Sequence, residues 1–351
     1  MMLMVISSFF SCGFFSSPLP EYTDPLDCYG VDVAEGPEDF VLDTWTGTPR
    51  LIVSSHERRG PAPSGDIYSF DLATGDTSRL ERTGEPESLP AFKPHGMDIR
   101  RHEGKTWLYV VLHDPHDRSV SDEHAIGIYD VGADELKFVE LLEDTGHLWS
   151  PNDISVLPDG GIYATNDKRG QLDVYLKMET SEVVYYNPEN GKWSVVASDL
   201  AYANGVLARE DRVFVSATRS DALMEYPRNA DGTLGDGIKI MDVKGPDNIM
   251  PFNDYLVLTA HFDDIAFLQH QSDGENPSPT VVFLVDPDSG PDAGPDEDDL
   301  SKNAKAIYVD DGHRISAAST AFIWDGKLYI SQVFDSEIVV CEAGDMDMSM
   351  E

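Results

Sequence analysis

Positive charge is scarce in this 351-residue sequence, which holds 25 Lys and Arg residues against 64 Asp and Glu residues and has a formal net charge of −39. The first basic residue is Arg50. So negative a surface repels phosphate backbones and anionic lipid headgroups, which argues against nucleic acid as a partner. The acidity fits either a surface kept soluble in a salty or extracellular medium, or carboxylates that bind hard cations.

Long hydrophobic runs are also missing. Residues 1–19 are apolar and aromatic, but they lack a basic start and are too short and too interrupted by serine for a stable membrane span. We interpret residues 1–19 as a signal peptide or a disordered apolar N-terminus, and residues 20–351 as a single domain. This interpretation predicts an exported protein, whether secreted, periplasmic or held at the cell surface.

Cysteine is the next scarce residue. Apart from Cys12, the chain has only Cys28 and Cys341, near opposite ends of the predicted domain. Two cysteines in an exported chain favour a disulfide, which would join the first segment of the fold to the last. The alternative is a pair of unrelated buried thiols.

Helical patterns and common hydrolase motifs are absent as well. No amphipathic segment of about 12 residues is present, which argues against alternating strands and helices. The sequence contains neither G-x-S-x-G nor H-E-x-x-H. A serine nucleophile on an α/β-hydrolase scaffold and a zinc peptidase helix are therefore not supported.

What the chain does contain is a long series of short runs rich in Val, Ile, Tyr and Phe, which predict β-strands. Turn-forming Asp-Gly and Asn-Gly pairs, which favour hairpins, occur at 159–160, 190–191, 231–232, 311–312 and 325–326. The predicted strands are 50–55, 66–72, 106–114, 125–131, 137–143, 153–158, 161–167, 182–188, 192–198, 212–219, 255–261, 280–287, 304–311, 320–326, 327–334 and 337–343.

Six short polar signatures recur along the chain, each before an apolar run. The steps between them are 57, 57, 52, 44 and 71 residues. A period near 50 with three or four strands per unit is typical of a six-bladed β-propeller. The acidic, Pro- and Gly-rich residues 286–299 predict a solvated insertion loop, which lengthens the last step. The signatures are Glu38-Asp39, His95-Gly96-Met97, Asn152-Asp153-Ile154, Asn204-Gly205-Val206, Asp247-Asn248-Ile249 and Ser319-Thr320-Ala321.

If equivalent positions of each unit face one axis, the signatures bring carboxylate and amide oxygens together. Oxygen-only ligands suit Ca²⁺, whereas Zn²⁺ prefers histidine and cysteine. Any single pair of this kind is more often an ordinary turn, and recurrence before strands is what favours a metal site. The proposed ligands are Glu38, Asn152, Asn204, Asp247 and Asn248.

At these same residues the chain resembles the paraoxonase family of calcium-dependent arylesterases and lactonases. The resemblance spans roughly Cys28 to Cys341, and it implies a six-bladed propeller with a central tunnel, a ring closed by the N- and C-terminal segments, and two calcium ions in the tunnel. The motifs that carry it are GPED (36–39), HGMDI (95–99), VVLH (110–113), SPNDISVLPDGGIYATND (150–167), ANGV (203–206), PDNI (246–249) and STAFIWDGKLYISQVF (319–334).

The resemblance also assigns roles. The five residues proposed as ligands would hold a catalytic calcium. A structural calcium deeper in the tunnel would be held by Asp39, Asp153 and the backbone carbonyl of Met97. His95 and His113 would be catalytic and His261 would line the pocket, while Cys28 and Cys341 would form a ring-closing disulfide. Ala260 stands where animal members have a cysteine, and the N-terminal segment differs from their lipoprotein-binding helix.

These assignments predict a calcium-dependent hydrolase of lactones and aryl esters, with a small-molecule substrate. Metal would stabilise the oxyanion formed when water attacks the carbonyl, and His95 would take the proton from water, with His113 as its relay. Glu38 or Asp247 could serve as the base instead, and both histidines could be pocket-wall residues. The alternative functions are a gluconolactonase-like hydrolase and a non-catalytic propeller stabilised by calcium.

Overall fold

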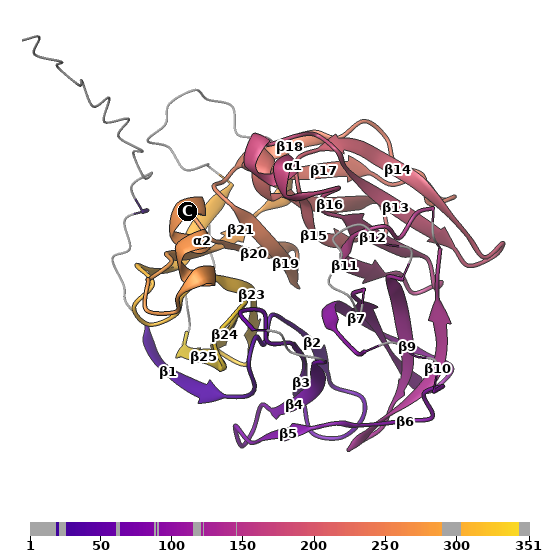
Figure 1. Cartoon of the computed structure of the whole chain (residues 1–351), viewed down its shortest axis with the longest axis horizontal. Helices are drawn as coiled ribbons and strands as arrows, with labels where there is room; N and C mark the ends of the chain where they lie inside the picture. Colours follow the sequence, from indigo (N-terminus) through magenta and orange to yellow (C-terminus); the bar gives the residue numbers. More distant parts are fainter. Residues whose placement is uncertain are drawn as a thin grey trace, which may run out of the picture.

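The computed structural model describes residues 19–20, 26–60, 64–87, 89, 91–114, 121, 123–144, 146–289 and 303–343. Six β-sheets stand around a central axis like the blades of a propeller (Figure 1). Consecutive strands within each blade are antiparallel neighbours and run from the axis outward. The predicted all-β, six-bladed propeller is therefore confirmed.

The first three blades come from the first half of the chain. In blade 2, the short strand β6 pairs in parallel with β10, so this sheet has five strands. The strands are β2 (Asp39–Asp43), β3 (Arg50–Ser55), β4 (Asp66–Asp71) and β5 (Thr77–Arg79) in blade 1; β6 (Glu81–Thr83), β7 (Pro94–His102), β8 (Lys105–Leu112), β9 (Ala125–Val131) and β10 (Glu135–Leu142) in blade 2; and β11 (Pro151–Val156), β12 (Ile162–Asn166), β13 (Ser181–Asn187) and β14 (Lys192–Leu200) in blade 3.

The last three blades follow the same plan, except that blade 6 takes its outer strand from the N-terminal side of the chain. The strands are β15 (Ala203–Ala208), β16 (Arg212–Ala217), β17 (Ala222–Pro227) and β18 (Ile238–Asp242) in blade 4; β19 (Pro246–Phe252), β20 (Tyr255–Ala260), β21 (Thr280–Val285) and β22 (Ala304–Asp310) in blade 5; and β23 (Ala318–Trp324), β24 (Lys327–Gln332), β25 (Glu337–Glu342) and β1 (Asp27–Asp32) in blade 6.

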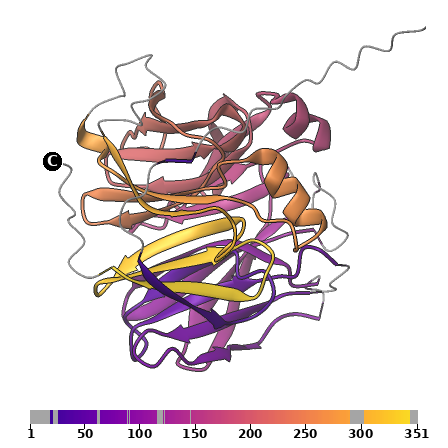
Figure 2. The same ribbon diagram turned by 90° about the vertical axis from the view of Figure 1, so that its left-hand side faces the viewer.

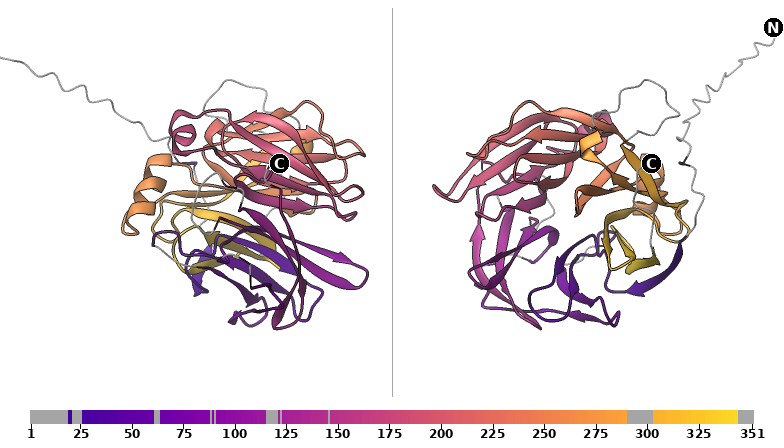
Figure 3. Two further views of the ribbon diagram at one scale, coloured as in Figure 1. Left: turned by 45° about the vertical axis from the view of Figure 1, so that its right-hand side comes forward. Right: turned by 180° about the vertical axis from the view of Figure 1, so that it is seen from behind.

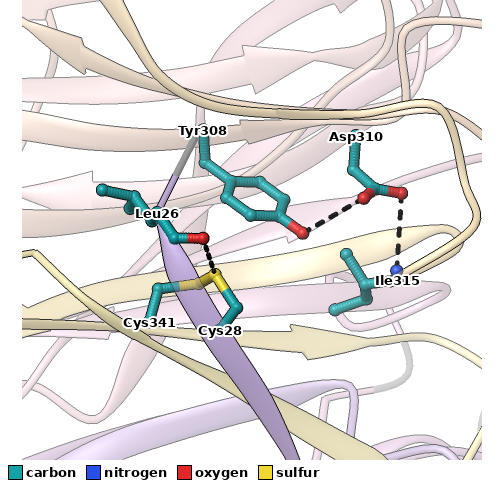
Figure 4. The surroundings of a disulfide bond; sticks show 6 residues. All are labelled: Leu26, Cys28, Tyr308, Asp310, Ile315 and Cys341. Carbon is teal, nitrogen blue, oxygen red and sulfur yellow. Dashed lines mark hydrogen bonds between the residues drawn. A yellow bond between two sulfur atoms is a disulfide. The ribbon is translucent and has the colours of Figure 1, made fainter. Parts of the chain in front are cut away.

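Blade 6 closes the ring. Strand β1 pairs antiparallel with β25, and Cys28 lies directly opposite Cys341 in that pairing. The two cysteines form a disulfide across 313 residues of sequence, which confirms the predicted pairing (Figure 4). Early and late segments of the chain are thus joined both by backbone hydrogen bonds and by a covalent bond.

The hydrophobic core lies between blades. One cluster combines Ile52 and Ile67 of blade 1 with Leu108 and Tyr129 of blade 2, and all four side chains are fully buried. Similar clusters join the other neighbouring blades. Because both faces of each sheet are covered by neighbouring blades, successive residues of a strand are often both apolar.

Two helices interrupt the strands, α1 (Gln171–Leu176) and α2 (Asp264–Ser272), along with the 3₁₀ turns η1 (Thr218–Ser220) and η2 (Pro287–Ser289). Both α-helices lie at the same end of the ring, as the side view makes plain (Figure 2). Seen from behind, the opposite end of the ring carries no α-helix among the described residues (Figure 3). No helix of the described chain has the length and apolarity required to cross a membrane.

Two predicted segments fall mainly outside this description. The proposed signal region at residues 1–19 is described only at Leu19, and the acidic loop at 286–299 only through Ser289. The division into a leader and one domain over 20–351 therefore stays a prediction.

Candidate active site and metal centre

The signatures lie at the start of the innermost strand of each blade. In β7, β11, β15, β19 and β23, the strand register shifts between the first residue and the residue three positions later. The two residues within each shift belong to a signature. Such bulges release side chains from the regular alternation and re-aim them, here toward the axis.

Glycine in two signatures allows neighbouring blades to approach closely. A Cβ atom at Gly96 would lie 2.6 Å from Asp153 Oδ1, and one at Gly205 would lie 2.6 Å from the carbonyl oxygen of Asp247. Contacts this short exclude a larger residue at either position. The glycines of the HGM and ANG motifs are thus explained by the close approach of neighbouring blades next to the polar side chains.

The polar side chains line two cavities along the axis. The outer cavity, of about 210 Å³, is bordered by Glu38, His95, Asn152, Asn204, Asp247 and His261, and by residues of α1 and α2. The inner cavity, of about 200 Å³, is bordered by Asp39, Met97, Asp153 and Asn248 among apolar neighbours. Four of the five ligands predicted for the outer ion border the outer cavity, whereas Asn248, the fifth, borders the inner one together with the residues predicted for the inner ion.

Hydrogen bonds orient the three asparagines. The amide nitrogen of Asn204 donates to Asp247 Oδ1 at 2.5 Å, and that of Asn152 faces Asp167 Oδ2 at 3.5 Å. The amide nitrogen of Asn248 donates to Thr320 Oγ1 at 2.8 Å. Since carboxylates only accept hydrogen bonds, the first two contacts direct each NH₂ group toward its partner and the amide oxygen away from it.

Four buried oxygens of the proposed calcium ligands have no close hydrogen-bond donor. They are Glu38 Oε2 and the Oδ1 atoms of Asn152, Asn204 and Asn248. An unsatisfied buried acceptor is costly, and each of these belongs to a proposed ligand of the catalytic calcium. The donor set, made of carboxylate and amide oxygens, fits a hard divalent ion such as Ca²⁺.

The fifth proposed ligand, Asp247, is already hydrogen-bonded through both carboxylate oxygens. Oδ1 accepts from Asn204, and Oδ2 lies 2.9 Å from His261 Nε2. Among the described residues, no three His, Cys, Asp or Glu side chains are grouped so as to hold a metal alone. The candidate centre is consistent with this because it relies on three asparagines.

Glu38 is the most heavily contacted of the ligand candidates. Its Oε1 accepts from Ser319 Oγ at 2.7 Å, and its Oε2 lies 3.4 Å from His95 Nε2 and 3.8 Å from Arg58 Nη2. Burial raises the pKa of Glu38, but the charge and hydrogen bond of His95, with help from Arg58, bring it down to about 2. This carboxylate is therefore ionised and available to a cation.

The inner group differs because its carboxylates serve as ties between blades. Asp39 Oδ2 accepts from the backbone N–H of Met97 at 2.7 Å, and Asp153 Oδ2 accepts from that of Val206 at 2.8 Å. Burial raises the pKa of Asp39 well above its ordinary value, and the Glu38 charge adds to the rise. Burial also raises the pKa of Asp153, reinforced by Asp39. A cation would relieve this repulsion.

The two predicted catalytic histidines are in contact. His95 Nδ1 lies 2.5 Å from His113 Nε2, and the ring centroids are 4.6 Å apart. Burial lowers the pKa of His113 well below its ordinary value, and the neighbouring His95 lowers it further. His113 is thus held neutral. His261, the predicted wall residue, packs on Phe267 of α2 at 4.2 Å between centroids.

Sequence reasoning missed several residues that border the outer cavity. Arg58 follows β3 in a loop, and Tyr202 precedes β15 with a positive φ of 60°. Arg219 lies close to both helices, because its Nε donates to the Val174 carbonyl at 3.0 Å and its Nη1 pairs with Asp264. None of these three residues has an equivalent at the same position in another blade, so the regular spacing of the signatures did not point to them.

Comparisons with known proteins agree with this architecture. The family model Arylesterase matches residues 58–343. Serum paraoxonase/arylesterase 1 of Mus musculus is 26% identical over 290 residues, which cover 78% of this chain and 76% of that protein. Serum paraoxonase/lactonase 3 of Homo sapiens is 25% identical over 345 residues, covering 92% and 90% respectively.

Solved structures with the same fold include a putative gluconolactonase, with a TM-score of 0.56 at 16% identity and coverage of 92% of this chain and 93% of that one. A luciferin-regenerating enzyme gives a TM-score of 0.58 at 9% identity, covering 92% and 96%. The calcium-binding protein regucalcin from Agrobacterium tumefaciens gives 0.52 at 14% identity, covering 90% and 94%. At these identities the likeness concerns the fold alone.

Fold and family together define a propeller hydrolase that acts on esters and lactones. The chain belongs to the arylesterase family, since the family model spans most of its length. It is accordingly an enzyme, a carboxylic ester hydrolase of the paraoxonase-like kind.

Proposed function

We propose that this enzyme hydrolyses lactones and aryl esters with the help of calcium, and that it works outside the cytoplasm. The observation that supports the calcium requirement is the set of four buried oxygens without close donors, three at the outer cavity and that of Asn248 beside the inner one. The names of the curated relatives, arylesterase and lactonase, support the two substrate classes. The Cys28–Cys341 disulfide supports an oxidising compartment.

Two ions are proposed, as the resemblance implies. Glu38, Asn152, Asn204, Asp247 and Asn248 would hold the outer ion, and Asp39, Asp153 and the Met97 carbonyl would hold the inner one. A bound divalent ion supplies a Lewis acid that polarises an ester carbonyl and stabilises the resulting oxyanion. The inner ion would mainly secure the ties between blades.

His95 is the proposed general base. Because His113 is held neutral, its Nε2 can accept the proton of His95 Nδ1, which leaves the lone pair of His95 Nε2 on the cavity side, near Glu38. That lone pair would take a proton from the attacking water, and His113 Nε2 would accept the Nδ1 proton in turn. Once protonated, His95 Nε2 lies 3.4 Å from Glu38 Oε2, and the charge and hydrogen bond of that imidazolium keep the pKa of Glu38 low, so the ionised Glu38 stabilises the proton that His95 takes up.

The apolar wall of the cavity suits aryl and lactone rings. Phe267 and Leu268 of α2, with Val333 and Phe334 after β24, border the same space as the polar ligands. A site with apolar walls and a few convergent polar groups is what a small neutral ester needs for binding and orientation.

The decisive experiment measures hydrolysis of phenyl acetate and δ-valerolactone before and after chelation, and again after adding back Ca²⁺. Activity should vanish with verified metal removal and return with Ca²⁺. Unchanged turnover in metal-free protein would refute the calcium requirement.

A histidine pair tests the base. His95→Gln should lower kcat by about a hundredfold or more, the usual contribution of a general base. His102→Gln is the matched control, because His102 lies on the same strand with half of its side chain exposed. Full turnover in His95→Gln would transfer the role of base to a ligand carboxylate.

A further inference from the structure

Arg58 is a largely buried cation at the wall of the outer cavity, with 16% of its side chain exposed. Its Nη1 donates to the carbonyl oxygens of Gly36, at 3.1 Å, and His56, at 2.9 Å. These two bonds fix the plane of the guanidinium group. Arg58 is therefore held in place before any ligand arrives.

The other side of this guanidinium is open. Among the residues that the structure describes, none accepts a hydrogen bond from Nε or Nη2, and the nearest carboxylate oxygen, Glu38 Oε2, stands 3.8 Å from Nη2. Nε and Nη2 form the planar edge with which arginine grips a carboxylate through two parallel hydrogen bonds. A single oxyanion oxygen would occupy only half of that edge.

Charge balance points the same way. Of the charged residues that border the cavity, Arg219 is paired with Asp264, and the carboxylates of Glu38 and Asp247 would together balance a divalent ion. Arg58 is then the cation left without a counter-charge. A buried charge without a partner is unfavourable, so the loaded site attracts an anion.

We propose that the preferred substrates carry a carboxylate of their own, and that the Nε–Nη2 edge of Arg58 binds it while the scissile carbonyl faces the metal ligands. This inference rests on the proposed function and specifies its substrate class: small lactones or esters with a carboxylate near the carbonyl. The cavity of about 210 Å³ has room for a compact ring of this kind.

Binding gives the first test, independent of turnover. Tetrahydrofuran-2-carboxylate has the ring and the carboxylate but no ester, so its calorimetric titration into calcium-loaded protein reports recognition alone. The wild-type protein should bind it more tightly than the neutral tetrahydrofuran-2-carboxamide. Arg58→Met should weaken carboxylate binding by about tenfold or more, as expected for a charge-assisted bidentate contact, and Arg58→Lys should lie between the two.

Turnover gives the second test. The wild-type kcat/KM should favour 5-oxotetrahydrofuran-2-carboxylate over its carboxamide, and Arg58→Met should remove most of that preference. Arg79→Met is the matched control, because it removes one positive charge from an exposed position on β5. Thermal unfolding and calcium titration of each variant check that the fold and the metal site persist.

The outcomes separate this inference from the function on which it rests. An equal loss of kcat/KM on both lactones in Arg58→Met, with the preference kept, would overturn the inference and place Arg58 at the reacting carbonyl. Equal binding of carboxylate and carboxamide by the wild-type protein would also overturn it. Failure to hydrolyse phenyl acetate, with carboxylate binding that depends on Arg58, would instead refute only the proposed function.

Discussion

Replacing Asn152 by leucine should change stability in opposite directions with and without calcium. The Asn152 amide oxygen is buried and has no donor, while its nitrogen makes only one long contact of 3.5 Å, to Asp167. Asp167 keeps Ser150 and Lys168 as donors in the variant. Leucine has a similar branched shape and no polar atoms, and the cavity beside Asn152 can take its larger volume, so in chelated protein the change mainly removes an unsatisfied acceptor.

The expected magnitudes follow from these contacts. Burying an unsatisfied acceptor costs about 1–3 kcal/mol, so in chelator the unfolding free energy of Asn152→Leu should equal or exceed that of the wild type by up to this amount. In saturating Ca²⁺ the variant lacks one ligand of five. Each tenfold loss of affinity costs about 1.4 kcal/mol, so the variant should then be less stable by at least that much.

Denaturant unfolding in chelator and in excess Ca²⁺ measures both free energies. The control is Thr259→Val, because Thr259 Oγ1 is another buried oxygen without a donor, on the second strand of blade 5. Thr259→Val should change the unfolding free energy by the same amount in chelator and in excess Ca²⁺. If Asn152→Leu destabilises the protein equally with and without Ca²⁺, its oxygen is no ligand and the metal centre must be redrawn.

Three further perturbations test other parts of the structure. Cys28→Ser with Cys341→Ser should lower the unfolding free energy by up to about 5–6 kcal/mol, the chain-entropy value for a 313-residue separation; denaturant unfolding against the oxidised wild type measures this loss, and the reduced wild type should match the variant. Burial raises the pKa of Asp98 to about 6 from 3.8, so the folded state holds this proton more tightly than the unfolded chain. As the pH rises from about 4 to 6 in chelator, Asp98 should therefore cost the protein at most about 3 kcal/mol of stability, and Asp98→Asn should remove this share of the pH dependence. Arg219→Met should loosen α1 and α2 and raise KM for phenyl acetate several-fold with a smaller change in kcat; a change in kcat alone would contradict this positioning role.

Much of the fold could be predicted because the middle strands of each blade are buried on both faces and form continuous apolar runs. The run at 50–55 coincides with β3, and the run at 255–261 with β20 apart from its last residue. The outer strand β14 was predicted by the run at 192–198, whereas the outer strand β18 was missed because it mixes Lys and Asp with Ile and Met. The helix α1 buries none of its six residues, so no apolar stripe marks it.

The candidate site was predictable to the extent that it is periodic. Asn152 and Asn204 recur at the same place in successive blades, and the structure brings both to the outer cavity. Arg58 and Tyr202 belong to loops that each blade builds differently. Their approach to the cavity depends on loop conformation, which short-range sequence patterns do not encode.

The closure of blade 6 by β1 has a consequence for the order of assembly. During synthesis the earliest strand cannot meet β25 until more than three hundred residues have followed it, so its hydrogen-bonding edge stays unpaired for most of translation. Five sheets can form from neighbouring segments alone, whereas the sixth needs both extremities at once. From this topology we expect ring closure to come late in folding, followed by oxidation of the two thiols across the closed pair of strands.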